Sequence, residues 1–218
     1  MASQIIYGVQ PVQEAERGRR RRVHQVWRAP ETSGAELERL CGSPDHQGVV
    51  AEVDPYPYGD AEGMLRKPDA LIVALDQVQD PRNLGAVCRS AESAGAAGVV
   101  IPERRAAMVT PVVCKTSAGA VEHLEVAQVR NLADWLVEAK EAGFWIWGAD
   151  ADGQQPPWGV DLTGPTVIVL GGEGKGLRPR VASNCDALIA LPTLGQIESL
   201  NVSAAATALL FESVRQRS

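Results

Sequence analysis

The sequence predicts an α/β fold built around a parallel β-sheet. From residue 70 onward, short apolar runs rich in β-branched residues alternate with segments of helical period. Several of these runs lack polar alternation, which is typical of strands buried on both faces of a parallel sheet. Strands and helices that alternate along the chain indicate the α/β class. With 218 residues, the chain is long enough to bury such a core without disulfides or metal ions.

Five apolar runs are the predicted strands. One lies inside a stretch rich in proline and glycine, residues 43–68, and the other four follow that stretch. Each run has the length of a strand rather than of a helix, and turn-forming residues separate the runs. The predicted strands are residues 48–53, 70–75, 98–101, 144–148 and 166–170.

Three segments have the character of helices. In residues 84–91, apolar side chains recur at spacings of three and four, which places them on one helical face. A second helix is expected from a capping residue, Asn131, to Ala142, because Gly143 then ends it. A final helix covers residues 203–216, with alanine, leucine and valine on one side.

A shift in composition near residue 60 divides the chain. Residues 43–68 contain four prolines and few apolar side chains outside residues 48–53. Proline and glycine at this density link or end elements. We therefore expect a small N-terminal unit at 1–60, a linker at 61–69 and a larger domain at 70–218.

Composition places the chain among globular proteins. Hydrophobic residues make up 45% and charged residues 22%, and no apolar run approaches the ~20 residues of a membrane span. The first residues lack the charged-then-apolar order of a secretory signal. The sequence thus predicts a cytoplasmic protein with no membrane partner. Its four cysteines are scattered, without a C-x-x-C pair, so they indicate neither a metal site nor a disulfide framework.

One basic run interrupts an acidic chain. The formal net charge of -6 argues against a general nucleic-acid binder, because phosphate neutralisation requires lysine and arginine. Arg19, Arg20, Arg21 and Arg22 nevertheless follow one another directly. Two interpretations stay open for this run: a solvated surface, or a contact with RNA.

The segment TVIVLGGEGKGL, residues 166–177, is a predicted strand that runs into a glycine-rich turn. A P-loop needs lysine and then serine or threonine after its final glycine, but Leu177 and Arg178 follow Gly176. The Rossmann spacing is one residue short, and Glu173 would repel a pyrophosphate. A nicotinamide oxidoreductase is therefore disfavoured. The glycines alone are also compatible with a tight structural turn.

Two further polar clusters have structural explanations. Asn83 precedes the helical pattern at 84–91 and can cap a helix. Arg89 and Glu92, three residues apart, can form an ordinary surface ion pair. Ser199 and Asn201 precede the final helix and can likewise cap it.

The combination of these motifs is more specific than any one of them. Asn83, Arg89 and Gly95 are spaced N-x5-R-x5-G, LGGEGKGL follows from Leu170, and LPTLGQIESLNVSAAA follows from Leu191. This order of motifs resembles that of the SpoU/TrmH branch of the SPOUT superfamily. The members of this branch are RNA ribose 2'-O-methyltransferases that use S-adenosylmethionine. The resemblance covers about 150 residues, from 70 to 218. The sequences YGVQPVQ, HQGVVAEV and FESVRQRS are similar to members that methylate a guanosine of 23S rRNA.

The resemblance carries expectations about architecture that periodicity alone does not. It implies a SPOUT-type parallel sheet whose C-terminal segment forms a trefoil knot, although knots are rare in proteins. It also implies a homodimer and an N-terminal RNA-binding domain similar to ribosomal protein L30e. That domain is shortened here, to about 60 residues.

Site residues follow from the same resemblance. It implies cofactor contacts at Gly171, Leu191 and Leu200, and it implies no metal. The catalytic residue would be Arg89, and the surrounding site would consist of Asn83, Glu173, Ser199 and Asn201. A guanidinium is a poor proton acceptor at neutral pH, so Arg89 either activates the hydroxyl or holds an RNA phosphate.

Other functions remain as alternatives. The methylated RNA could be tRNA rather than rRNA. A noncatalytic RNA-binding protein for ribosome assembly on the same fold would predict loss of Arg89, of the glycine-rich loop or of the SLN motif. All three are present, which favours the enzyme.

Overall fold

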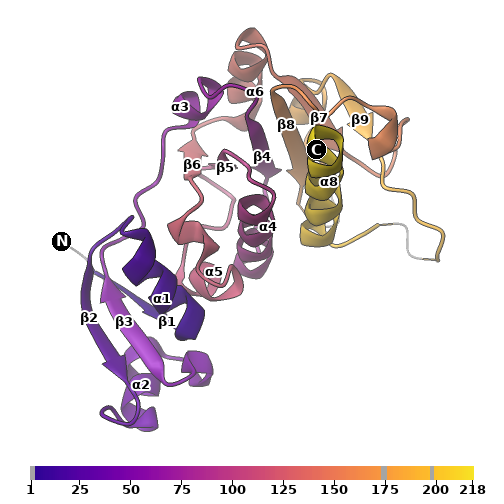
Figure 1. Ribbon diagram of the computed structural model, residues 1–218. Helices are drawn as coiled ribbons and strands as arrows, with labels where there is room; N and C mark the ends of the chain where they lie inside the picture. Colours follow the sequence, from indigo (N-terminus) through magenta and orange to yellow (C-terminus); the bar gives the residue numbers. More distant parts are fainter. Residues whose placement is uncertain (1–2, 173–175, 197–198) are drawn as a thin grey trace.

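The computed structural model describes residues 3–172, 176–196 and 199–218. Within these residues the chain forms a three-stranded sheet and a six-stranded sheet. The smaller sheet belongs to the first 53 residues, and the larger sheet follows it in the chain (Figure 1). Each sheet packs against helices, so the expected α/β class is confirmed.

The N-terminal sheet is antiparallel, in the order β1-β3-β2. Its strands are β1 (Gln4–Tyr7), β2 (Val23–Arg28) and β3 (Val49–Val53). Helix α2 (Gly34–Cys41) packs on one face, where Tyr7, Leu37 and Val50 form a small core. Helix α1 (Val9–Gly18) contributes Val12 and Ala15 to the main core instead. A short 3-10 turn, η1 (Pro44–His46), precedes β3.

The larger sheet has the order β6-β5-β4-β8-β7-β9, and every neighbouring pair is parallel. Because all strands point the same way, their carboxyl ends meet at one edge. The strands are β4 (Leu71–Asp76), β5 (Gly98–Pro102), β6 (Val126–Val129), β7 (Trp145–Ala149), β8 (Thr166–Gly171) and β9 (Ala187–Ile189).

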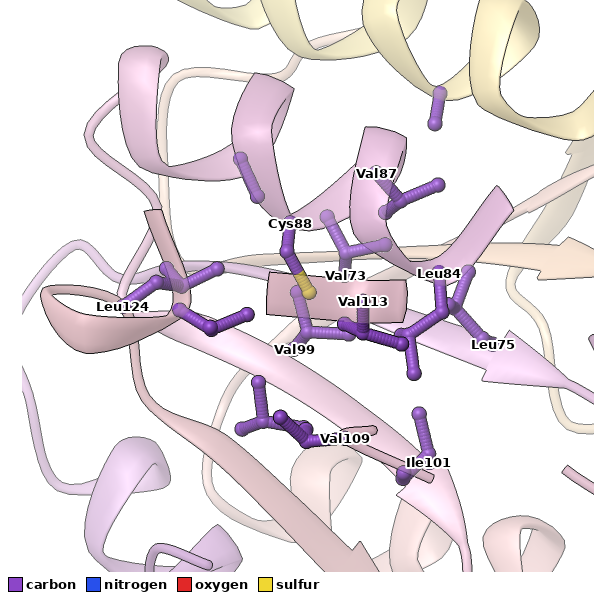
Figure 2. Packing of buried hydrophobic residues seen from close by; sticks show 14 of the residues in the cluster. Val73, Leu75, Leu84, Val87, Cys88, Val99, Ile101, Val109, Val113 and Leu124 are labelled. Carbon is purple, nitrogen blue, oxygen red and sulfur yellow. The ribbon is translucent and has the colours of Figure 1, made fainter. Parts of the chain in front are cut away.

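Helices cover both faces of this sheet, as strands without polar alternation require. Successive residues of β4 belong to different cores: Val73 and Leu75 pack beneath α4, whereas Ile72 and Ala74 face the side of α6. Figure 2 shows Val87 and Cys88 of α4 packed over β4 and β5. The remaining elements are α3 (Ala61–Leu65), α4 (Pro81–Ser93), α5 (Pro111–Thr116), η2 (Ala120–Glu122), α6 (Leu132–Glu141), η3 (Pro157–Gly159), α7 (Pro179–Ala182) and α8 (Val202–Arg217).

The predicted strands each agree with an observed strand to within one residue at either end. The predicted cap of α6 is also present, since Asn131 Oδ1 accepts a hydrogen bond from the Ala133 amide at 3.1 Å. Strands β1, β2, β6 and β9 were not predicted. Strands β1, β6 and β9 have only three or four residues, which are too few to show a pattern, and β2 has no fully buried side chain to give one. Residues 61–69 are not a bare linker, because they begin with α3, whose Ala61 and Met64 are buried.

A buried ion pair joins the N-terminal unit to the larger domain. Arg21 Nη2 lies 2.5 Å from Glu122 Oε1 in η2, and the two side chains are 1% and 0% exposed. Arg21 also donates to Gln4 Oε1 in β1, at 2.6 Å, and to Cys114 Sγ in α5, at 3.2 Å. The prediction that Arg21 contacts RNA is therefore wrong, because this guanidinium is enclosed by protein.

Two further properties concern the described residues only. No helix among them is both long and apolar enough to cross a membrane. They also contain no group of three or more histidine, cysteine or acidic side chains arranged to hold a metal ion.

Candidate active site

A cavity of about 420 Å³ opens at the carboxyl ends of β8, β7 and β9. The three predicted cofactor residues, Gly171, Leu191 and Leu200, all line it, and so does Ser199. The structure thus brings together residues from two separate motifs, the glycine-rich segment and the segment that begins at Leu191. The other lining residues come from the ends of these strands and from α8: Ala149, Asp150, Ala151, Asp152, Leu170, Gly172, Gly176, Ile189, Thr193, Val202, Ala205 and Leu209.

Glycine is required where the backbone closes around this cavity. A Cβ atom on Gly171 would overlap the carbonyl group of Gly176, and one on Gly172 would lie 2.5 Å from the Gln77 carbonyl oxygen. Gly176 has a φ of +61°, a conformation that side chains disfavour. The glycine-rich turn therefore brings backbone groups together at the cavity wall, where no side chain would fit.

A buried carboxylate, Asp76, anchors the chain that follows this turn. It ends β4, and its Oδ2 accepts a hydrogen bond from the Arg178 amide at 2.8 Å. Its Oδ1 accepts from Arg178 Nε at 2.7 Å. Asp76 is not among the site residues predicted from the sequence. The available signal was an acidic residue directly after a predicted buried strand, at the sheet edge where ligands bind in α/β folds.

Two more acidic residues were missed, Asp150 and Asp152, which line the cavity after β7. Asp150 Oδ1 accepts a hydrogen bond from the Asp152 amide at 3.0 Å. No lysine or arginine is among the described residues that line this cavity. Its polar groups therefore favour a ligand that carries positive charge and no phosphate.

Helices α4 and α8 meet beside the cavity through two asparagines. Asn201 Nδ2 donates to Asn83 Oδ1 at 3.1 Å, and Asn83 is only 7% exposed. Asn201 also caps α8, as predicted, because its Oδ1 accepts from the Ser203 amide at 2.9 Å. The predicted capping role of Asn83 is wrong: α4 begins at Pro81, and Asp80 Oδ1 accepts from the Arg82 amide at 2.8 Å.

Arg89 lies on the exposed side of α4, outside the cavity lining. Within residues 3–172, 176–196 and 199–218 it forms no ion pair, so the surface pair with Glu92 is not present. An exposed guanidinium that is not held by a carboxylate is available to an anionic substrate. Glu173, the remaining predicted catalytic residue, lies outside the described residues.

The rest of the arginine run has a mixed environment. Arg19 and Arg22 are exposed, and both line an open hollow of about 660 Å³ on the N-terminal unit. Arg20 is half-buried, with its guanidinium 5.8 Å from the centre of the Tyr56 ring. His24 forms a 2.7 Å contact with Asp54 at the same hollow, and this hydrogen bond lowers the pKa of Asp54.

The fold and the cavity define a parallel α/β protein that binds a ligand at the carboxyl edge of its sheet. The chain belongs to the SpoU rRNA methylase family, whose model matches residues 70–211. A second model, described as RNA 2'-O ribose methyltransferase substrate binding, matches residues 30–59. The family predicted from the motifs is thus confirmed.

Two relatives show how much of the chain is shared. The 23S rRNA (guanosine-2'-O-)-methyltransferase RlmB of Pseudomonas putida is 40% identical, over 97% of this chain and 96% of the relative. An uncharacterized tRNA/rRNA methyltransferase of Mycolicibacterium vanbaalenii is 46% identical, over 84% of this chain. The chain spans about 60% of the length of that mycobacterial relative.

Solved structures agree with the fold. The SpoU methyltransferase AviRb from Streptomyces viridochromogenes, in complex with the cofactor AdoMet, superposes with a TM-score of 0.81 at 30% identity. The match covers 99% of this chain and 90% of AviRb. An RNA 2'-O ribose methyltransferase gives a TM-score of 0.83 at 27% identity, over 99% of this chain and 89% of its own.

Proposed function

We propose that this chain transfers a methyl group from S-adenosylmethionine to a ribose 2'-hydroxyl of RNA, and that the substrate is a guanosine of 23S rRNA. The observation that carries the proposal is the cavity at the carboxyl ends of β8, β7 and β9, which the family motifs enclose. Similarity to RlmB of Pseudomonas putida along nearly the whole chain supports the ribosomal substrate. Such a substrate implies action in the cytoplasm.

The residues present fit this cofactor. A volume of about 420 Å³ lies in the usual range for sites that hold small molecules. S-adenosylmethionine carries a sulfonium and an ammonium and has no phosphate, which suits a lining with Asp150 and Asp152. The backbone at Gly171 and the segments around Leu191 and Leu200 would hold the adenine and methionine portions.

The cofactor supplies a methyl group that is already activated, so the protein has to align the two reactants and manage the hydroxyl proton. Arg89 would hold an RNA phosphate and polarise the 2'-hydroxyl, because a guanidinium does not accept protons near neutral pH. The Asn83–Asn201 hydrogen bond fixes the start of α8 beside the cavity. Ser199 and Glu173 complete the proposed site.

The proposed architecture includes a C-terminal knot and a homodimer. In support of the knot, α8 follows the last strand of the sheet and returns to pack against α4, where Thr207 contacts Ser90 at 2.7 Å. In support of a dimer, α8 exposes an apolar face that includes Phe211, which is 47% exposed. Residues of one subunit would then complete the RNA site of the other. Light scattering should give twice the chain mass of 23.2 kDa, and an active monomer would contradict the dimer.

The N-terminal unit is proposed to bind RNA with an L30e-like fold, through Arg19 and Arg22 among others. The match of the substrate-binding model to residues 30–59 supports this role.

A noncatalytic RNA-binding protein and a tRNA methyltransferase are the competing functions, and the methylated nucleotide distinguishes them.

Methyl transfer from labelled S-adenosylmethionine to ribosomal RNA tests the proposal. Arg89→Ala should keep cofactor affinity within about threefold while turnover falls at least ~100-fold, the range for loss of a group that acts on the reacting atoms. Arg66→Ala, at an exposed arginine directly after α3, is the control and should change neither quantity. Methyl transfer by Arg89→Ala at the parent rate would exclude the catalytic assignment. Methylation found in tRNA would exclude the ribosomal substrate. Methylation found in no RNA would exclude the enzyme.

A further inference from the structure

The cavity occupies only half of the carboxyl edge of the sheet. It lies over β8, β7 and β9, whereas β4, β5 and β6 form the other half of the same edge. Three connecting segments emerge there, at residues 77–80, 103–110 and 130. Two inter-strand spacings separate β4 from β6, a distance of about 10 Å.

Four exposed arginines come from these segments and from the first turn of α4. We call Arg82, Arg104, Arg105 and Arg130 the edge arginines. None of them pairs with a carboxylate in the part of the chain that the structure describes, a property they share with Arg19, Arg22 and Arg89. Seven other exposed arginines do form such pairs: Arg17, Arg28, Arg39, Arg66, Arg178, Arg180 and Arg215.

The segment that carries Arg104 and Arg105 is fixed to its neighbours by backbone hydrogen bonds. The Glu103 amide donates to the Val129 carbonyl at 2.9 Å, and the Ala107 amide donates to the Val78 carbonyl at 2.8 Å. The Val109 amide also donates to the Tyr58 hydroxyl at 2.9 Å. These hydrogen bonds tie the segments after β4, β5 and β6 into one surface.

Arg105 has a left-handed backbone, with a φ of 60°. This conformation costs a residue other than glycine about 1 to 2 kcal/mol. The chain therefore keeps an arginine where glycine or asparagine would be more stable.

Few negative charges oppose this surface. Asp80 caps α4 through a hydrogen bond from a backbone amide, which does not neutralise its carboxylate, whereas Asp76 is paired with Arg178. Glu103 is exposed beside the edge arginines. Among the described residues, four guanidinium groups thus face two carboxylates, Asp80 and Glu103, along half of the edge, within a chain whose net charge is -6.

We propose that the edge arginines bind successive phosphates of the RNA strand and guide it from β6 toward the cavity over β8. Planar guanidinium groups suit this role because they bind phosphate in a bidentate manner. The inference rests on the proposed function, since it assumes that the substrate is RNA. It places the phosphate contacts on the larger domain, next to the reacting atoms, in addition to the N-terminal unit.

A charge-matched pair of triple variants tests the proposal. The first carries Arg104→Gln, Arg105→Gln and Arg130→Gln. The control carries Arg66→Gln, Lys67→Gln and Arg215→Gln, which removes the same charge from exposed basic residues outside the N-terminal unit. Binding of a 23S rRNA fragment is measured between 50 and 300 mM salt (roughly, the range in which phosphate contacts dominate), together with KM and kcat for that RNA.

Removal of each arginine that binds a phosphate should lower the slope of log Kobs against log salt by about 0.7 to 0.9. The edge variant should therefore lose about 2 to 3 slope units and raise KM for RNA at least tenfold, with kcat within threefold of the parent. The control should keep the parent slope and KM. Equal slopes in the two variants would overturn the proposal.

Failure of the proposed function is distinguishable from failure of this inference. If the parent binds S-adenosylmethionine but methylates no RNA, the proposed function fails, and the salt slopes still report on the edge arginines. If the parent methylates RNA and the edge variant behaves as the control does, only this inference fails.

Discussion

Removal of Glu122 should destabilise the protein more than any surface change. Glu122→Ala leaves the Arg21 guanidinium without its carboxylate partner in a site where the two side chains are 1% and 0% exposed. The hydrogen bonds from Arg21 Nε to the two carboxylate oxygens, at 3.1 and 3.2 Å, are removed as well. Arg21 would keep Gln4 and Cys114 as polar neighbours, and neither carries a compensating negative charge at neutral pH.

The magnitude follows from the burial. Breaking a buried ion pair by removing one partner destabilises proteins by about 3 to 5 kcal/mol, because a charge remains in a medium that solvates it poorly. The total free energy of unfolding of a domain is about 5 to 15 kcal/mol. Glu122→Ala should therefore remove a large fraction of the stability and should loosen the N-terminal unit first, since Arg21 connects it to η2.

Urea unfolding followed by circular dichroism measures this difference at pH 7. Glu36→Ala is the control, because it breaks an exposed pair with Arg39 and should cost less than about 1 kcal/mol. The double variant Arg21→Met, Glu122→Leu should recover most of the stability, since it leaves no charge unpaired. A Glu122→Ala protein within 1 kcal/mol of the parent (about the value for an exposed pair) would refute the reasoning.

Two other changes test the cavity and the core. Gly171→Ala should weaken S-adenosylmethionine binding at least tenfold and destabilise the fold by about 1 to 3 kcal/mol, because the added Cβ overlaps the Gly176 carbonyl group. Gly164→Ala is the control, because the space around Gly164 is open, and it should change neither the affinity nor the stability. Calorimetric titration measures the affinity, and thermal unfolding measures the stability. Burial raises the pKa of the Cys88 thiol to about 12. The thiol of the unfolded chain therefore loses its proton first, near pH 9, and the folded protein loses stability as the pH rises from about 9 to 12. The parent's unfolding free energy should fall over this window by about 1.4 kcal/mol per pH unit more than that of Cys88→Ala, and parallel pH profiles would contradict this.

The sequence was sufficient to predict the strands that are buried on both faces. Strands β4 and β8 are continuous apolar runs, so their position could be predicted to within one residue. Strand β9 has only Ala187–Ile189, and its pairing with β7 depends on contacts that no local pattern shows. The architecture was therefore predictable where burial leaves a local signature.

The candidate site was predictable only where a motif identified it. Gly171, Leu191 and Leu200 line one cavity, as their shared family motifs led us to expect. Arg21 could not be predicted in this way, because an arginine within a basic run indicates an exposed side chain, whereas the Arg21 side chain is buried. Its partner Glu122 is 101 residues away in sequence, and only the tertiary structure brings the two together.

The position of the cavity also determines the stage of folding at which a bound ligand can stabilise this protein. Val202, Ala205 and Leu209 of α8 form part of its wall, so a growing chain that has reached residue 200 has every strand of the sheet but no enclosed cavity. A ligand stabilises only states that contain its site. Cofactor in the cell would therefore leave earlier folding intermediates unaffected and would protect the protein only after its last helix has docked. A chain cut before Val202 should gain no resistance to proteolysis from added cofactor, however much is supplied.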